Sequence, residues 1–146
     1  GGLMVIVVGS LWWRRYQMQR VYNAKNKKSK QVKLASEVAL WQLEKLSHDQ
    51  LIEKGSLHQY CSRISGILKL FLSNYYGNKT KELTTLELKK FLLKKEVDKE
   101  TQKRVTNVLA ACDKLKFAND HSGIDPKQLS QKTRDIVVRI QNIGHT

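Results

Sequence analysis

Histidine and cysteine are the side chains of this sequence best suited to bind a metal ion or to act as nucleophiles. The chain contains His48, His58, His121, His145, Cys61 and Cys112. On a helix, His58 and Cys61 would share one face, but no second close pair completes the ligand spacing of a zinc site. We therefore predict that no metal is bound and that both cysteines are reduced core thiols of a cytoplasmic domain.

The segment NDHSGIDPKQL, residues 119–129, is superficially similar to a calcium-binding loop. When Gly123 is aligned with the glycine of such a loop, its first and twelfth positions are Ala118 and Leu129, which offer no side-chain oxygen to the ion. Glycine-rich phosphate loops, nucleophile elbows and carboxylate pairs beside a histidine are also missing from the sequence. We predict a protein that is not an enzyme and has no cofactor.

Binding to another protein is the remaining chemistry that these residues can provide. The stretch ACDKLKFAND, residues 111–120, places an acid, two lysines and a phenylalanine at the predicted end of a helix. We expect Asp113 to form a structural ion pair with Lys116 or with a cation of a neighbouring helix, such as Arg63. The alternative is that Asp113, Lys116 and Phe117 form a surface for a partner protein. The ring of Phe117 is expected to fold over the edge of the core.

The elements that must position these residues are all predicted to be helices. Apolar residues recur at three- and four-residue steps, which is typical of amphipathic helices, and no stretch alternates as a strand would. The predicted helices cover residues 34–53, 56–77, 84–95, 98–116 and 125–143. We therefore predict an all-α fold in which residues 34–146 form a compact five-helix bundle that buries its own core.

Capping residues mark the ends of these helices. Ser56 and Thr84 are each followed three residues later by Gln or Glu, which is the capping-box pattern. Asp98 and Asp125 are predicted N-caps, the second of them followed by a proline at the first helical position. Gly77 and Gly55 are expected to end the helices before them.

The N-terminal segment differs from the rest in composition. Residues 1–13, GGLMVIVVGSLWW, carry no charged side chain. As a helix they would cover roughly 20 Å, whereas a bilayer core is about 30 Å thick. We therefore expect residues 1–16 to be the C-terminal part of a transmembrane helix that begins before Gly1. The predicted membrane-interface residues are Trp12, Trp13, Arg14, Arg15 and Tyr16.

Positive charge is concentrated directly behind this segment. The chain has a formal net charge of +14, and residues 14–33 contain eight basic residues and no acid. We predict that residues 17–33 are a basic juxtamembrane segment, which either binds anionic lipid or is a solvated linker that fixes topology. The positive residues place the following domain in the cytoplasm. A secretory signal peptide, or a buried core segment of a soluble protein, remains an alternative reading of the first 13 residues.

Five stretches carry a resemblance to a known family. They are ALWQLEKL with LIEKG (39–46 and 51–55), YCSRISGILKLFL (60–72), ELTTLEL (82–88) and ACDKLKFA (111–118). Over residues 34–140 the chain resembles the cytoplasmic helical domain of single-span, BatD-like membrane proteins from bacterial aerotolerance (Bat-type) gene clusters. It departs from that pattern at Cys61, Ile64, Lys114 and Leu115. The resemblance implies an envelope-associated role, with MoxR-type AAA ATPase or von Willebrand factor A proteins as partners and no recognised catalytic activity.

The functional prediction combines the anchor with the bundle. We expect a single-pass protein of the bacterial inner membrane whose cytoplasmic domain holds partner proteins, with an unknown oligomeric state. The candidate partner-binding residues are Tyr60, Arg63, Asp113, Lys116 and Phe117. The alternative is a basic helical domain that binds nucleic acid or anionic lipid through lysines and arginines between residues 89 and 104. Acids at four positions interrupt that ridge, so nucleic acid is the less favoured partner.

Overall fold

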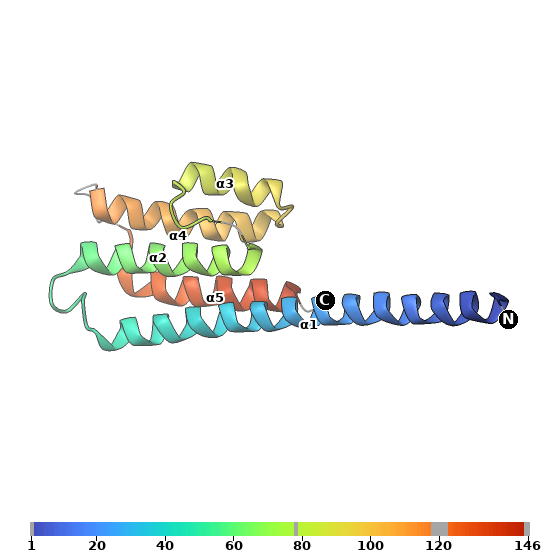
Figure 1. Cartoon of the computed structure of the whole chain (residues 1–146). Helices are drawn as coiled ribbons and strands as arrows, with labels where there is room; N and C mark the ends of the chain where they lie inside the picture. The colour runs from blue at the N-terminus through green and yellow to red at the C-terminus, as the bar shows by residue number, and fades with distance from the viewer. Residues whose placement is uncertain (1, 78, 118–122, 145–146) are drawn as a thin grey trace. The chain divides into compact units, whose positions relative to one another are not determined.

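The structure, a computed structural model, describes residues 2–77, 79–117 and 123–144 (Figure 1). Within these ranges the chain forms helices and no strand, which confirms the all-α prediction. The helices are α1 (Gly2–His48), α2 (Leu57–Tyr76), α3 (Thr85–Lys94), α4 (Lys99–Phe117) and α5 (Pro126–Gly144). His121 and His145, two of the candidate metal ligands, and most of the calcium-like segment before Gly123 lie outside the described residues.

The chain divides by its contacts into two units, residues 1–31 and 32–146. The first unit is helical throughout its described residues, 2–31, and belongs to α1. The second unit contains the end of α1 and helices α2 to α5. Composition had placed the start of the bundle nearby, at residue 34.

The helix predicted to begin at residue 34 begins much earlier, because it and the N-terminal apolar segment belong to the single helix α1. Residues 17–33 contain neither proline nor glycine and are rich in Gln, Lys and Arg, which are good helix formers. Nothing in this segment therefore interrupts the backbone hydrogen bonds. Among the described residues, no helix combines the length and the apolar character needed to cross a bilayer.

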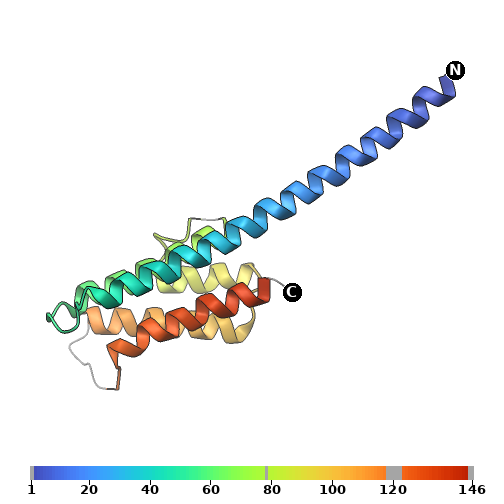
Figure 2. The same cartoon turned by 90° about the horizontal axis from the view of Figure 1, so that it is seen from below.

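In the second unit, α2, α4 and α5 pack against one another and α3 packs on α4 (Figures 1 and 2). The C-terminal part of α1 supplies Ala35, Ala39, Leu43 and Leu46 to the same core. The largest fully buried side chains come from every helix of the unit; among them are Leu43, Phe71, Leu88, Leu109 and Ile136. Some apolar residues at the same helical spacing are less covered: Val38, Leu57, Tyr75 and Phe91 are only partly buried, and Ile143 is exposed.

The helix ends agree with the capping predictions except at two places. Thr84 Oγ1 accepts a hydrogen bond from the Glu87 backbone N–H at 3.2 Å, and Gly77 ends α2 in the left-handed conformation with φ 71°. Ser56, by contrast, makes no side-chain capping bond. Its ψ of 52° is outside the extended region that N-caps favour, and its N–H is bonded to the Leu51 carbonyl.

Helix α1 also ends earlier than predicted, at His48 instead of near residue 53. The chain leaves the helix through Gln50, whose φ is positive at 52°, and turns again at Gly55, with φ 77°. Leu51 is buried between these two positions and holds the turn against the core. An apolar residue that continues a helical pattern can therefore be buried from a turn.

A polar network connects α4 to α5. The Asp98 carboxylate accepts hydrogen bonds from the Thr101 backbone N–H at 3.0 Å and the Thr101 hydroxyl at 2.6 Å, as expected of an N-cap. Arg139 of α5 donates to Thr101 Oγ1 at 2.9 Å and to Asp98 at 3.1 Å. Hydrogen bonds from Thr101, together with the positive charge of Arg139, lower the pKa of Asp98 to about 2.

Candidate functional site

A surface groove runs between the C-terminal part of α1 and the middle of α2, and has a volume of about 400 Å³. All its lining residues belong to the second unit. They are Trp41, Gln42, Lys45, Leu46, Asp49, Arg63, Gly66, Ile67, Leu70 and Lys81, and we call this site the α1–α2 groove. Helical periodicity explains the placement of Trp41 and Lys45, because they are four residues apart and share one side of α1. Asp49 follows in the turn directly after the helix.

The charges around the groove are mostly positive. Lys45, Arg63 and Lys81 line it together with a single acid, Asp49. Arg63 and Asp49 form an ion pair across the turn between α1 and α2. Since this pair accounts for one cation and the only acid, Lys45 and Lys81 supply the net positive charge of the site.

Trp41 gives the groove an exposed aromatic wall. Its side chain is 60% exposed, although it lies on a well-packed bundle. The Lys45 ammonium lies 5.1 Å from the centre of the indole ring, a cation–π distance that holds the two side chains together. Tryptophan beside cations is a common composition at the energetic centre of protein interfaces.

Gly66 and Gln42 both line the groove. Gly66 lies inside α2, and a Cβ atom added there would meet no atom within 4 Å. The Oε1 atom of Gln42 is buried and accepts no hydrogen bond from the described residues. The groove therefore has an open notch over the α2 backbone at Gly66.

Of the five predicted partner-binding residues, only Arg63 lines the α1–α2 groove. Asp113, Lys116 and Phe117 are neighbours at the end of α4. Lys116 Nζ lies 3.9 Å from the Asp113 carboxylate and 5.1 Å from the centre of the Phe117 ring. Thr85 of α3 also donates a hydrogen bond to Asp113, at 2.8 Å.

These contacts show which cation forms the ion pair with Asp113. Its cation is Lys116, as the i, i+3 spacing predicted, and not Arg63, which pairs with Asp49. The expectation that Phe117 folds over the core is wrong, because its side chain is 76% exposed and meets the His58 ring edge-on at 6.1 Å. Phe117 is the last residue of α4, so its side chain projects beyond the packed stripe.

Tyr60, the remaining predicted residue, is buried between α2 and α5, where it is hydrogen-bonded to Ser130. Burial raises the pKa of its hydroxyl, and the hydrogen bond to Ser130 acts in the opposite direction. The structure therefore separates Tyr60 from the exposed end of α4, although Arg63, one turn later on α2, is accessible.

The two cysteines meet inside the bundle. Cys61 of α2 and Cys112 of α4 are free, fully buried thiols in contact with each other, as the prediction of core thiols required. Burial raises the pKa of both thiols, that of Cys112 to about 12. The described residues include no cluster of three His, Cys, Asp or Glu side chains able to hold a metal ion.

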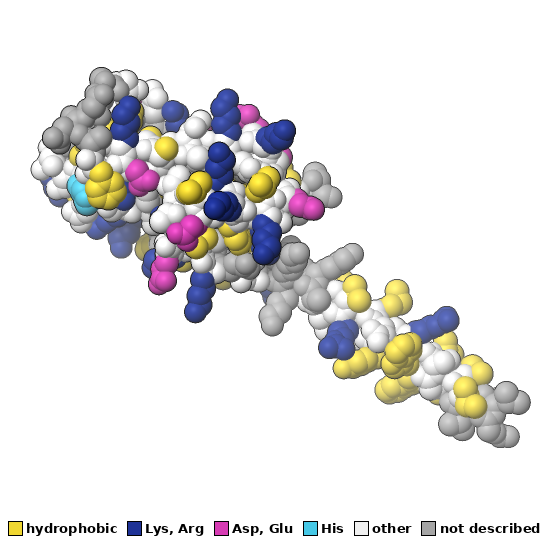
Figure 3. Space-filling model, turned by 90° about the horizontal axis from the view of Figure 1, so that it is seen from above, with side chains coloured by type: hydrophobic (Ala, Val, Ile, Leu, Met, Phe, Trp, Pro, Cys, Tyr) yellow, Lys and Arg dark blue, Asp and Glu magenta, His cyan; other side chains and the backbone are white. Residues whose placement is uncertain are grey.

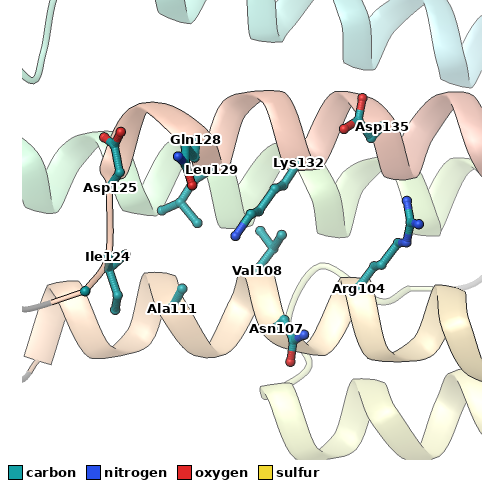
Figure 4. Close-up of a pocket in the computed structure, with 11 residues that line it drawn as sticks. Arg104, Asn107, Val108, Ala111, Ile124, Asp125, Gln128, Leu129, Lys132 and Asp135 are labelled. Carbon is teal, nitrogen blue, oxygen red and sulfur yellow. The ribbon is translucent and has the colours of Figure 1, made fainter.

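A second cavity, of about 300 Å³, lies between α4 and α5 (Figure 4). Lys132 extends from α5 toward α4 and Arg104 extends from α4 toward α5, above an apolar floor that includes Val108 and Leu129. Arg104 is already paired with Glu100 at 3.1 Å. Asp125 and Asp135 balance the two cations of the lining, so this cavity has no net charge with which to select a ligand.

The predicted basic ridge is not a continuous surface. Figure 3 shows Lys and Arg side chains that are spread over the face and interleaved with acids. Arg104 of this ridge is neutralised by Glu100, and Lys95 lies over the ring of Phe91. Basic side chains interleaved with acids in this way are typical of a solvated surface. They give little support to a continuous binding site for nucleic-acid phosphates.

In the first unit, the predicted membrane-interface residues are all exposed. Trp12 is 75% exposed, and Trp13 and Tyr16 are almost as accessible. Large apolar side chains remain exposed along this part of α1; they are Ile6, Val7, Val8, Leu11, Met18, Val21 and Tyr22. None of the residues of this unit whose burial is described is buried.

The comparisons with known proteins find no relative. No protein-family model matches the chain, and neither the curated proteins nor the solved structures include a significant match. The assignment of a function therefore depends on the chemistry of the chain itself and on the resemblance described above.

The α1–α2 groove was missed by sequence reasoning, although three signals pointed to it. Trp41 lies off the buried stripe of its helix, Lys45 follows it at the i, i+4 spacing, and Gly66 is inside a helix that is otherwise regular. These three residues come together in one groove only because of the way α1 packs on α2. The periodicity of the sequence does not specify that packing.

Proposed function

We propose that this chain is a membrane-anchored, non-catalytic interaction domain of the bacterial inner membrane. In this proposal the N-terminal part of α1 is the end of a spanning helix, and the bundle holds partner proteins at the cytoplasmic face. The observation that carries the anchor is the run of exposed apolar side chains between Ile6 and Tyr22. Such side chains are stabilised when they leave water for a lipid phase.

The order of residues supports the proposed orientation. Trp12, Trp13 and Tyr16 have amphipathic rings of the kind that collect at the headgroup level, and Arg14 and Arg15 begin the basic segment beyond them. Basic residues stay preferentially on the cytoplasmic side, where each also gains about 1 kcal/mol near an anionic leaflet.

The partner class comes from the resemblance to Bat-type proteins, which implies a MoxR-type AAA ATPase or a von Willebrand factor A assembly. The α1–α2 groove supports a binding role, since it combines an exposed tryptophan with free cations and an open notch. No described cluster of side chains in the bundle offers the acid–base or nucleophilic geometry of an active site.

Flotation with lipid vesicles tests the anchor. The whole chain should float with the vesicles, and a Val8→Asp/Leu11→Asp variant should remain at the bottom, because each buried carboxylate costs about 3 kcal/mol in lipid. The matched control is Leu86→Asp/Leu93→Asp, which changes two exposed apolar residues of α3 and should still float. If the wild type does not float, or if both variants lose flotation equally, the anchor is wrong.

Two further measurements test the orientation and the alternative function. Protease added outside intact spheroplasts should leave the bundle undigested; digestion would contradict a cytoplasmic domain. A gel-shift series at rising salt tests nucleic acid, because phosphate binding weakens steeply with salt. Salt-sensitive binding that tightens at low salt would favour the alternative, and its absence would remove it.

A further inference from the structure

We propose that the α1–α2 groove binds an acidic amphipathic helix of a partner protein, with one aliphatic side chain of that helix seated over Gly66. This inference rests on the proposed function, since it names the kind of segment by which a partner is held.

Charge complementarity selects an acidic partner. Lys45 and Lys81 have no opposite charge among the residues that line the groove, because Asp49 is paired with Arg63. Lys45 is held beside the ring of Trp41, at 5.1 Å from its centre, and both side chains line the groove. Carboxylates on both sides of an anchored apolar residue would therefore meet positive charge.

The shape of the groove selects an aliphatic anchor. Leu46, Ile67 and Leu70 provide apolar lining, and Trp41 forms one wall. Gly66 leaves the α2 backbone uncovered at the centre, with no atom within 4 Å of the position of a Cβ. A glycine inside a helix costs about 1 kcal/mol relative to alanine, and packing within the bundle does not require it here.

A helix fits this site better than a nucleic acid does. The groove lies between two helices, and a small residue at its centre allows a third helix to approach closely, as in helix-in-groove recognition. The Asp49 carboxylate and the aliphatic lining are unfavourable neighbours for a phosphate backbone. A lipid headgroup would leave the notch over Gly66 unfilled.

Tryptophan fluorescence can measure this binding directly. In a Trp12→Phe/Trp13→Phe chain, Trp41 is the only tryptophan and it lies in the groove. The probe is a synthetic helical peptide of about 18 residues with leucine at three- and four-residue steps and glutamate elsewhere. We expect a saturable change in Trp41 emission. A scrambled peptide of the same composition should bind at least about tenfold more weakly.

Matched variants locate the site. Gly66→Leu fills the notch and should weaken peptide binding at least about tenfold, whereas Gly66→Ala should change it by less than about threefold. Both substitutions favour helix, and a Cβ at this position meets no other atom, so we expect both variants to remain folded. Urea unfolding of the two variants checks that a loss of binding is not a loss of structure. Lys45→Glu/Lys81→Glu should abolish binding, and the control Lys89→Glu/Lys90→Glu, on exposed α3 positions, should preserve it.

Several outcomes overturn the inference and leave the anchor intact. They are an absence of binding at about 1 mM peptide, equal binding of the scrambled peptide, and full binding by the Gly66→Leu variant. Displacement of the peptide by single-stranded DNA at a lower concentration would assign the groove to nucleic acid. Because flotation does not involve the groove, a variant that floats but binds no peptide contradicts only this inference.

Discussion

At the scale of single residues, the buried sulfur pair has the clearest chemical consequence. Cys61 and Cys112 are inaccessible, and burial raises the pKa of both thiols, so little thiolate is present at neutral pH. We predict that a thiol reagent at pH 8 modifies the folded chain at least about a hundredfold more slowly than the urea-unfolded chain. Rapid modification of two thiols in the folded state would contradict this burial.

Asp98 predicts a specific dependence of stability on pH. Its pKa is lowered in the folded state, mainly by hydrogen bonds from Thr101, so its contribution is present above the ordinary pKa and disappears as the pH falls toward 2. Asp98→Asn, which keeps capping capacity but removes the charge, should lower the free energy of unfolding at pH 7 by up to about 1 kcal/mol.

Urea unfolding at pH 7 and at about pH 2.5 checks this prediction, because the difference between the variant and the wild type should be clearly smaller at the lower pH. Glu100→Gln is a useful control, since Glu100 forms a more exposed pair with Arg104 at the start of the same helix. A difference between Asp98→Asn and wild type that is equal at both pH values would show that charge is not responsible.

At the scale of elements, two serine/threonine caps make a matched comparison. Thr84 caps α3 through its side chain, whereas Ser56 precedes α2 without a side-chain capping bond. Thr84→Ala should therefore cost about 1 kcal/mol of stability, and Ser56→Ala clearly less. Denaturant unfolding of both variants measures the difference, and equal losses would contradict the observed cap geometry.

The same comparison shows how far sequence reasoning extends. Capping boxes at residues 56 and 84 look alike in the sequence, but only Thr84 has the extended backbone that lets the hydroxyl reach the N3 amide. Periodicity located the inner stripes of α2 and α4 because 3.6-residue spacing determines a face. It did not predict the end of α1, because Leu51 is buried from a turn and continues the apolar pattern.

The candidate site was less predictable than the fold for a related reason. Asp113 and Lys116 pair within one helix, and local spacing was sufficient to predict that contact. Arg63 pairs with Asp49 across the turn between α1 and α2, and the groove depends on the same interhelical packing. Contacts between elements depend on how the helices rotate and approach, which no local pattern encodes.

At the scale of the whole molecule, the bundle should not need the N-terminal unit to fold. Among the described residues, every buried hydrophobic side chain of the core belongs to residues 35–140, within the second unit. We predict that a chain starting at Val32 unfolds cooperatively in urea, whereas one starting at Ser47 does not, because it lacks Ala35, Ala39, Leu43 and Leu46. Loss of cooperative unfolding in the longer of the two would show that the first unit contributes to the core.

Helix α3 is attached to the bundle by fewer buried side chains than α2 or α4. It contributes two fully buried side chains, Leu88 and Leu92, while α2 and α4 contribute many more. Amide protons of α3 should therefore exchange with solvent through partial openings that leave the other helices closed. Such an opening would free Thr85 from Asp113 and change the surroundings of Lys116 and Phe117. The contacts made by Asp113, Lys116 and Phe117 at the end of α4 therefore depend on whether α3 is packed against α4.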